Sequence, residues 1–404
     1  MCGATEPFTG SDAHVALHSP TVMQVLDIND VNVLSAVSGK GFRQFLRMPR
    51  AIYATDPHWV HPLLIERKQH LSRRNPVFQH LRWHAWVALR DGRCVGRISA
   101  QIDQLHLQRY ADDTGFFGML ESIDDPAVFG ALLKTAEDWL RERGMRRVRG
   151  PFNLNINEEC GLLIDGFDTP PSMMMGHARP YYRERLEQCG YVGAADTLAY
   201  IMPPQYAAPP VMQKLLAHVK KRTVVRVLRR ERLDEELGIL REIFNDAWSE
   251  NWGFLPFTEA EFAEIGRAML HLADPDMVQI AEVDGRPAAM IVALPNLNEI
   301  IADMGGRLFP FNWARLLWRL KVRYPRTARV PLMGVMKEFQ NTRMGPGLAF
   351  ALIDAEREVL FRRGIESVEL SWILADNLGM RNIIESLGGV AYKRYRLFEK
   401  TLDL

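Results

Sequence analysis

The chain has 404 residues, 47% of them hydrophobic, and a formal net charge of +1 at neutral pH. At about 150 residues per domain this length predicts two or three domains, and the apolar content suffices for packed cores. The near-zero net charge excludes a general nucleic-acid-binding protein, which would carry an excess of basic side chains.

The cysteines and the N-terminal residues bear on the cellular compartment. Cys2, Cys94, Cys160 and Cys189 lack C-x-x-C spacing, which excludes a zinc ribbon and favours a reducing cytosol, and we expect no bound metal. There is no run of about 18 apolar residues, and the first twenty residues do not have the pattern of a signal peptide. We therefore expect a cytoplasmic protein, with possible peripheral contact to the inner face of the cytoplasmic membrane.

The first elements of the chain are predicted from the positions of proline and glycine residues and from the periodicity of apolar residues. Residues 1–21 are small and polar and predict a flexible tail, and residues 23–26 predict a first strand. Residues 42–63, which two prolines interrupt, predict broken helices. Residues 84–90 and 94–102 flank an Asp-Gly turn and predict a β-hairpin.

Residues 150–182 form a polar, glycine-rich segment that ends in methionines and tyrosines. One interpretation is a loop braced by its own side-chain hydrogen bonds. The other is a substrate wall, in which a glutamate holds an ammonium group, methionines 173–175 line an adaptable apolar slot, and a histidine or tyrosine transfers protons. The candidate catalytic residues of this wall are Glu158, Glu159, His177 and Tyr181.

A linker divides the chain. Four prolines in residues 202–210 preclude regular structure, so we place a domain boundary there, with domains at 22–205 and 206–404. The second domain contains another Asp-Gly hairpin signal, at 277–294.

The two halves of the chain are similar to each other, which indicates duplication. At an offset of 220, the first-half residues Ala131, Gly144, Val148 and Asn157 match Ala351, Gly364, Val368 and Asn377. The preceding strands match at an offset of 216, so the second copy has about four extra residues in the turn that follows.

Residues 308–324 combine aromatic and basic side chains, and no acid occurs between Asp303 and Glu338. Such a segment can lie on an anionic bilayer, with its Trp and Leu side chains in the interface and its arginines near phosphates. The alternative is a core-packed helix with a solvated basic face, because Trp313 and Leu317 fit ordinary amphipathic spacing with Leu320.

From residue 330 onward the pattern is strand, glycine turn, helix, strand and helix. The apolar run 330–335 is followed by the polar turn 338–347 and then by a helical pattern. Unpaired amides and the macrodipole at such a helix start attract a pyrophosphate. A Gly-x-Gly turn alone is weak evidence, and the alternative is a helix start that binds nothing.

This order resembles the acyl-CoA-binding half of the GCN5-related N-acetyltransferase (GNAT) superfamily, whose turn reads Gln/Arg-x-x-Gly-x-Gly/Ala. Thr342, Gly345 and Gly347 align with that turn, and Arg343 lies one place late. The resemblance implies an α/β (α+β) fold of two tandem acetyltransferase-like domains, each a mixed, mostly antiparallel twisted sheet flanked by helices. The acyl-CoA-binding residues that it implies are Val335, Met336, Thr342, Arg343, Met344, Gly345, Gly347 and Asn377.

In the first copy the turn carries Asp124 and Asp125, whose charges would repel a pyrophosphate, so we infer that the second copy alone keeps the acyl-CoA site. The resemblance implies that a backbone N–H of Val335 or Met336 faces the thioester oxygen. It also implies a tyrosine acid seven residues after the asparagine, where this chain has Ile384. The candidate groups of the second copy are Glu338, Glu369 and Asn377.

The block 157–171 also resembles a bacterial group of duplicated acetyltransferase-like proteins to which ceramide synthases belong. That resemblance implies transfer of an acyl group from acyl-CoA or acyl carrier protein to a lipid-like primary amine such as a sphingoid base. The alternatives are an N-acetyltransferase for a small amine and a non-catalytic acyl-CoA-binding module. We expect the loop 157–165 and His177 to face the thioester end of the acyl-CoA site.

Overall fold

The computed structural model describes residues 31–270 and 273–403, so the predicted tail at 1–21 and strand at 23–26 lie outside the described residues. The strands of the first half are β1 (Asn32–Ser35), β2 (Leu81–Arg90), β3 (Arg93–Asp103), β4 (Thr114–Ser122), β5 (Arg147–Gly150), β6 (Leu162–Asp165) and β7 (Val192–Met202). Its helices are α1 (Gly39–Ile52), α2 (Leu64–His70), the 3-10 turn η1 (Pro76–Gln79), α3 (Gln104–Tyr110), α4 (Pro126–Arg141) and α5 (Tyr182–Gln188).

The second half repeats this plan. Its strands are β8 (Thr223–Val227), β9 (Val278–Val283), β10 (Arg286–Pro295), β11 (Thr327–Val335), β12 (Ser367–Leu374) and β13 (Val390–Thr401). Its helices are α6 (Pro210–Val219), η2 (Arg230–Arg232), α7 (Leu233–Ala247), α8 (Glu259–Leu270), η3 (Pro275–Met277), α9 (Leu297–Ile301), α10 (Asn312–Lys321), α11 (Lys337–Gln340), α12 (Met344–Arg362) and α13 (Leu378–Ser386).

Both predicted hairpins are confirmed. β2 pairs with β3 and β9 pairs with β10, each antiparallel. The turn residues Asp91, Gly92, Asp284 and Gly285 have φ values of 50°, 72°, 50° and 78°. Such left-handed turns match the twist of the flanking strands, and Asp-Gly adopts them readily.

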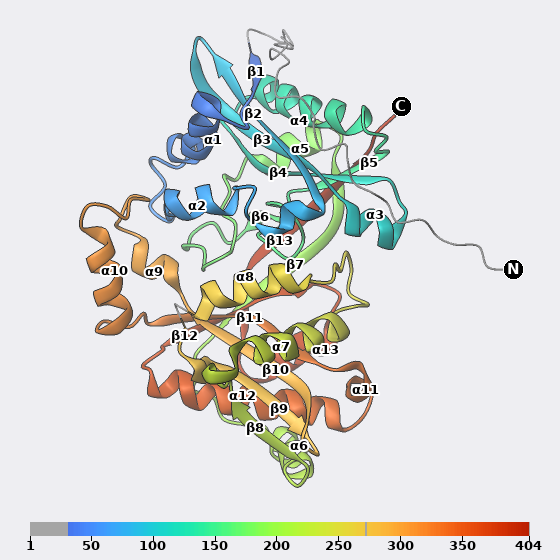
Figure 1. Cartoon of the computed structure of the whole chain (residues 1–404), viewed down its shortest axis with the longest axis vertical. Coiled ribbons are helices and arrows are strands. Elements are labelled where there is room, and N and C mark those ends of the chain that lie inside the picture. Colours follow the sequence, from blue (N-terminus) through green and yellow to red (C-terminus); the bar gives the residue numbers. More distant parts are fainter. Residues whose placement is uncertain (1–30, 271–272, 404) are drawn as a thin grey trace, which may run out of the picture.

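The main path of strands forms one sheet in the order β1-β2-β3-β4-β5-β13-β7-β12-β11-β10-β9-β8, with β6 paired to β13. Parallel pairing occurs between β4 and β5 and between β11 and β12, and the other strand pairs are antiparallel. The predicted mixed, mostly antiparallel sheet flanked by helices is therefore confirmed (Figure 1).

The two halves exchange their last strands at the centre of this sheet. β7 belongs to the first half in sequence but pairs with β12 of the second, and β13 pairs with β5 of the first. β7 and β13 also pair with each other, so the halves share a continuous central region in which β13 (red) crosses into the first half (Figure 1). The sequence boundary near residue 205 is thus not a boundary in the sheet.

The repeat follows the offset of 220 only in part. α4 and β5 correspond to α12 and β12, and Gly144 and Gly364 follow the two equivalent helices with φ values of 80° and 72°. The match of Asn157 to Asn377 is not structural, because α5 is the counterpart of α13 and Asn377 caps α13. Asn157 lies instead in residues 151–181, an insertion between β5 and α5 that we call the inserted loop.

Candidate functional site

A cleft opens in the second half where β11 and β12 separate. These parallel strands are paired up to Val330 and Leu370. Pro331 has no N–H to continue a ladder, and both strands leave their regular register at this level, β11 at Val330–Pro331 and β12 at Ser371–Trp372. The resemblance implied a backbone donor to the thioester at Val335 or Met336, which lie four to five residues further along, at the end of β11.

The cleft has a volume of about 700 Å³ and is bounded by β11, β12, the glycine turn, α13 and the linker around Tyr206. Of the residues predicted to bind acyl-CoA, the cleft is lined by Val335, Gly345 and Asn377. The others are not among the residues that line this cleft: Met336, Thr342, Arg343, Met344 and Gly347.

Val335 and Met336, whose backbone N–H groups were predicted to face the thioester oxygen, differ in the direction of those N–H groups. The N–H of Met336 donates to the carbonyl of Ala288 at 2.9 Å and is therefore engaged within the sheet. Because N–H groups alternate in direction along an antiparallel strand, those of Met333 and Val335 point away from β10, toward the cleft. Val335 remains a candidate donor, whereas Met336 would have to break a sheet hydrogen bond.

The glycine turn is held by its own contacts. The hydroxyl of Thr342 donates to the carbonyl of Phe339 at 2.8 Å and accepts from the N–H of Met344 at 3.1 Å. The N–H of Gly345 donates to the carbonyl of Thr342 at 3.3 Å. These amides, expected to be free for an anion, are thus satisfied within the turn.

Both glycines lie where an added Cβ would meet neighbouring protein atoms. A Cβ on Gly345 would lie 2.7 Å from the carbonyl oxygen of Phe339, inside the turn. A Cβ on Gly347 would lie 2.3 Å from Cγ1 of Val219 in α6. Gly347 therefore permits α6 and α12 to pack closely, a reason that the turn motif itself does not reveal.

The equivalent turn of the first half is closed by its own aspartate. The Asp125 carboxylate accepts from the N–H groups of Ala127 and Val128 at 2.8 and 3.4 Å and caps α4. A hydrogen bond from Arg90 lowers the pKa of Asp125. A side-chain carboxylate thus occupies the place where an external anion would bind.

An apolar cavity of about 180 Å³ lies between α7, α8, the sheet and the inserted loop. Aliphatic and aromatic side chains dominate its walls, including Leu240, Phe244, Phe257, Phe262 and Ile265. It shares wall residues with the cleft, namely Trp248, Asn251, Pro331, Trp372 and Leu374. The apolar cavity therefore adjoins the cleft where β11 and β12 separate, a feature that the sequence interpretation did not foresee.

A third cavity, of about 290 Å³, lies in the first half against α1, α2 and β4, and we call it the N-terminal cavity. Glu159 and His177 line it, as does Glu121. Glu159 is paired with Arg67 and accepts from the amide of Asn153 at 3.0 Å. This cavity is polar, in contrast to the apolar cavity.

Three ionisable side chains of the N-terminal cavity, those of Glu121, Glu159 and His177, are largely shielded from solvent, whereas its arginines at 47, 50 and 307 are exposed. Burial raises the pKa of Glu121, which accepts hydrogen bonds from the hydroxyls of Tyr53 and Tyr182 at 2.8 Å each. Burial lowers the pKa of His177, whose Nε2 lies 3.0 Å from the carboxylate of Asp56. Such clusters of buried ionisable groups in a cavity are typical of functional sites.

Three predicted catalytic residues have other surroundings. Glu158 pairs with His70 at 3.3 Å. The hydroxyl of Tyr181 donates to the carbonyl of Ser122 at 2.7 Å, and Glu338 is exposed on α11. None of these three is among the residues that line the cleft or the two cavities described above.

The inserted loop connects the three spaces. Asn157 and Met174 line the apolar cavity, and Met174 also lines the N-terminal cavity. Met175 lines the N-terminal cavity, and its sulfur lies 3.4 Å from the hydroxyl oxygen of Ser371, which lines the cleft. The loop of the first half thus reaches the place where β11 and β12 separate.

Helix α10 lies at the periphery of the molecule (Figure 1). Large apolar side chains of this helix and of the residues next to it are exposed to solvent. Leu316 and Leu320 pack against α9, whereas the other large apolar side chains of residues 309–322 are exposed. The exposed set, each between 46% and 77% accessible, is Phe309, Phe311, Trp313, Leu317, Trp318 and Val322. The core-helix interpretation, with Trp313 and Leu317 inward, was therefore wrong.

No helix in residues 31–270 or 273–403 is both long and apolar enough to span a bilayer. Within the same ranges no cluster of three or more His, Cys, Asp or Glu side chains has the arrangement of a metal site.

Comparison with known proteins gives two close relatives. The chain is 53% identical over 361 residues to protein YghO of Escherichia coli K12, covering 89% of this chain and 93% of that protein. It is 45% identical over 376 residues to the bacterial ceramide synthase of Caulobacter vibrioides, covering 92% and 98%. No family model matches the chain.

Two solved structures share the fold. One is a tandem GNAT protein from the clavulanic acid biosynthesis pathway, with a TM-score of 0.54 at 14% identity, covering 93% of this chain and 99% of that one. The other contains a GCN5-related glucosamine N-acetyltransferase region in a fungal multi-domain protein, with a TM-score of 0.55 at 15% identity, covering 94% and 39%.

Proposed function

This chain belongs to the family of duplicated GCN5-related N-acyltransferases that contains both relatives, and from that premise we propose that it transfers a long-chain acyl group to a lipid-like primary amine. The donor is acyl-CoA or an acyl carrier protein, and the acceptor that fits best is a sphingoid base, giving a ceramide-type amide. The protein is an acyltransferase of GNAT fold.

The observation that carries the long-chain proposal is the apolar cavity beside the cleft. An acetyl group needs no such space. A hydrocarbon chain gains about 0.8 kcal/mol for each CH₂ group removed from water, so a cavity walled by Phe, Leu and Trp favours a long chain. Trp372 lies on both spaces, where the thioester and the chain would meet.

The acyl-CoA would lie in the cleft between β11 and β12. Val335 supplies an N–H directed toward this space, Asn377 lies at its edge, and Gly345 forms part of its wall. The pyrophosphate would be attracted by the exposed side chain of Arg343 and by the macrodipole of α12, beside Thr342 and Met344. Gly347 acts indirectly, by letting α6 support the turn.

The amine head would be held in the N-terminal cavity. Partly buried carboxylates such as Glu159 and Glu121 suit an ammonium group or hydroxyls, and Met174 and Met175 form an adaptable wall toward the cleft. His177, held by Asp56, is the titratable group beside this wall. Glu158 and Tyr181 support the loop through their contacts with His70 and Ser122.

The exposed face of α10 is the surface that would lie on an anionic membrane. The Trp side chains of α10 and the two phenylalanines that precede it, at 309 and 311, would enter the interface, and Arg307, Lys321 and Arg323 would face lipid phosphates. A lipid-like amine dissolves in the membrane, so an enzyme resting on this surface meets its acceptor there.

The test is turnover measured by mass spectrometry of reactions that pair palmitoyl-CoA or acetyl-CoA with sphinganine or a small soluble amine. We expect the palmitoylated sphingoid base as the main product. Acetylation of the small amine in preference would replace the proposal with a small-amine acetyltransferase. Binding of acyl-CoA without any amide product would indicate a non-catalytic binding module.

A further inference from the structure

Ser371 and Glu369 lie on β12 at the level where the cleft opens, and both side chains are only 3% exposed. Ser371 is the first residue beyond Leu370, the last residue of β12 that pairs with β11. It lines the cleft, and its neighbour Trp372 lines both the cleft and the apolar cavity. A thioester whose chain enters the apolar cavity from the cleft must pass this point.

The Ser371 hydroxyl has a fixed direction. It donates to Oε1 of Glu369 at 2.6 Å and accepts from Nε of Arg329 at 2.9 Å. Because an arginine only donates, the serine proton points to one of two acceptors, Oε1 of Glu369 at 2.6 Å or the sulfur of Met175 at 3.4 Å. The carboxylate is the nearer and stronger acceptor, so the proton is assigned to it. A hydroxyl oxygen has two acceptor sites, so one remains for an N–H of the substrate.

Glu369 is held in place by neighbouring polar groups. Its second oxygen accepts a hydrogen bond from the hydroxyl of Tyr392, and Nε of Arg329 lies 3.5 Å from Oε1. Arg329 is itself anchored, since it donates to the carbonyl of Met173 at 2.9 Å and lies over the ring of Trp372 at 4.4 Å. The arginine and the tyrosine are positioning residues that hold the carboxylate and the hydroxyl in line.

We propose that Ser371 and Glu369 form the proton relay of the acyl transfer, an inference that rests on the proposed function. The amine nitrogen attacks the thioester carbon and forms the C–N bond. Its proton passes to Ser371 while the serine proton passes to Glu369. When the C–S bond breaks, the same path returns a proton to the thiolate, so the products are an amide and a free thiol with no other reactant.

The surroundings favour this assignment. Ile384 stands where the resemblance implies a tyrosine acid, and it lines the cleft without a titratable group. Glu338 is exposed on α11, while Glu159 lines the N-terminal cavity and is not among the residues that line the cleft. Met175, whose sulfur lies 3.4 Å from the Ser371 oxygen, is flexible and lines the N-terminal cavity from which the amine would approach.

The experiment compares turnover of palmitoyl-CoA and sphinganine by the full-length protein and its variants Ser371→Ala, Ser371→Thr and Glu369→Gln. Ser367→Ala, at the start of the same strand, is the matched control. General acid–base groups contribute about 100-fold to 10,000-fold, so Ser371→Ala and Glu369→Gln should lower kcat by at least about 100-fold. Ser371→Thr should keep most of the rate, and palmitoyl-CoA affinity by calorimetry should change little.

The pH profile separates a proton relay from a structural role. Because the relay transfers protons, Glu369→Gln should change the shape of the pH profile of kcat as well as its height. Equal losses for Ser371→Ala and Ser371→Thr would overturn the relay, because only the first removes the hydroxyl. If Ser371→Ala does not fold, a Glu369→Gln variant with the wild-type rate and profile overturns it. Absence of turnover by the wild type would instead contradict the proposed function.

Discussion

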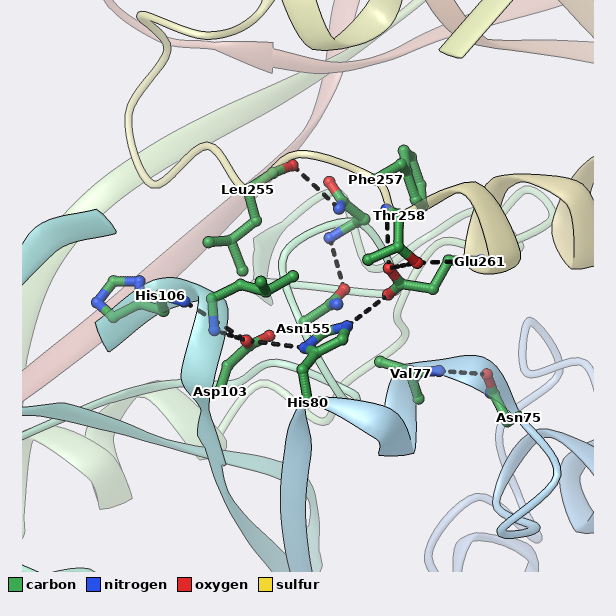
Figure 2. A network of polar contacts seen from close by, with 12 residues as sticks. Asn75, Val77, His80, Asp103, His106, Asn155, Leu255, Phe257, Thr258 and Glu261 are labelled. Atoms are coloured by element: carbon green, nitrogen blue, oxygen red, sulfur yellow. Dashed lines mark hydrogen bonds and ion pairs between the residues drawn. The ribbon is translucent and has the colours of Figure 1, made fainter. Parts of the chain in front are cut away.

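Nε2 of His80 lies 3.1 Å from the carboxylate of Glu261, and this contact joins the first half of the chain to helix α8 of the second (Figure 2). The other ring nitrogen lies 3.0 Å from Asp103, which also accepts the N–H of Leu105. Glu261 further accepts the hydroxyl of Thr258 at 2.6 Å at the start of α8. Because α8 forms a wall of the apolar cavity, this network fixes that wall against the first half.

The His80 network predicts a pH-dependent stability. Burial opposes its charge, but the hydrogen bonds with Asp103 and Glu261 raise the pKa of His80 to about 9. The unfolded pKa is about 6.5, so the stabilisation is complete below that pH and is lost as pH rises through about 9. We expect His80→Gln to lower the free energy of unfolding by about 2 kcal/mol at pH 6 and by less at pH 9.5.

Urea unfolding at both pH values measures this difference. His84→Gln is the control, because burial lowers the pKa of His84 to about 4 and the ring is neutral throughout this range. If His80→Gln lowers the free energy of unfolding by the same amount at pH 6 and pH 9.5, the histidine is not charged in the folded protein.

The contact of Gly347 with Val219 predicts a stability defect without loss of the ligand. Gly347→Ala places a Cβ 2.3 Å from Val219 Cγ1 and should destabilise the fold by about 1–3 kcal/mol. Val219→Ala should restore much of that loss in the double variant. Thermal unfolding measures both effects, and calorimetry with CoA should give similar affinity for the folded variants. If the double variant regains stability but still loses much of its CoA affinity, Gly347 contributes directly to CoA binding.

The exposed face of α10 predicts membrane binding driven by apolar side chains. Phe311→Ser with Trp318→Ser should weaken co-sedimentation with anionic liposomes at least tenfold, since burying each aromatic side chain contributes about 1.5–3 kcal/mol. Arg315 and Arg319 should matter less, because both are paired with Asp303. Val211→Ser, an exposed valine on α6, is the control. Equal liposome binding by the double variant and the wild type would contradict the proposed contact of this segment with the membrane.

Filling the apolar cavity should change chain-length preference. Ile265 lines the cavity from α8, and Ile265→Trp would occupy part of the space. We expect kcat/KM for palmitoyl-CoA to fall at least tenfold relative to that for a short-chain acyl-CoA, since displacing two CH₂ groups costs about 1.6 kcal/mol. Competition between the two donors in one reaction measures the ratio, and an unchanged ratio would place the acyl chain elsewhere.

The sequence predicted correctly those features that depend only on residues adjacent in the chain. The Asp-Gly turns gave both hairpins, because those two residues accept the left-handed conformation that the turns require. The glycine turn was recognised, but the reason for Gly347 lies in Val219, more than a hundred residues earlier in the chain. The relay likewise depends on Arg329, which meets Ser371 only after two strands have paired.

Other differences come from features that a single sequence pattern does not contain. β7 pairs with β12 and β13 pairs with β5, and these partners are far apart in the sequence. The hydrophobic pattern of each strand would be the same whether it paired within its own half or with the other half. In α10 both faces carry apolar side chains, so periodicity alone did not reveal that Leu316 and Leu320 pack inward while Trp313 and Leu317 stay outside. The inserted loop shifted the apparent match of Asn157, because a constant offset cannot follow an insertion.

The position of β13 has a consequence for biosynthesis. β5 of the first half is flanked by β4 on one side and by the last strand of the chain on the other. During synthesis the first half therefore leaves the ribosome while the β5 edge of its sheet is unpaired. That edge stays unpaired until residues 390–401, which form β13, have also been made. Unpaired edges invite association with other chains, so the nascent protein passes through an aggregation-prone stage that ends with its final strand.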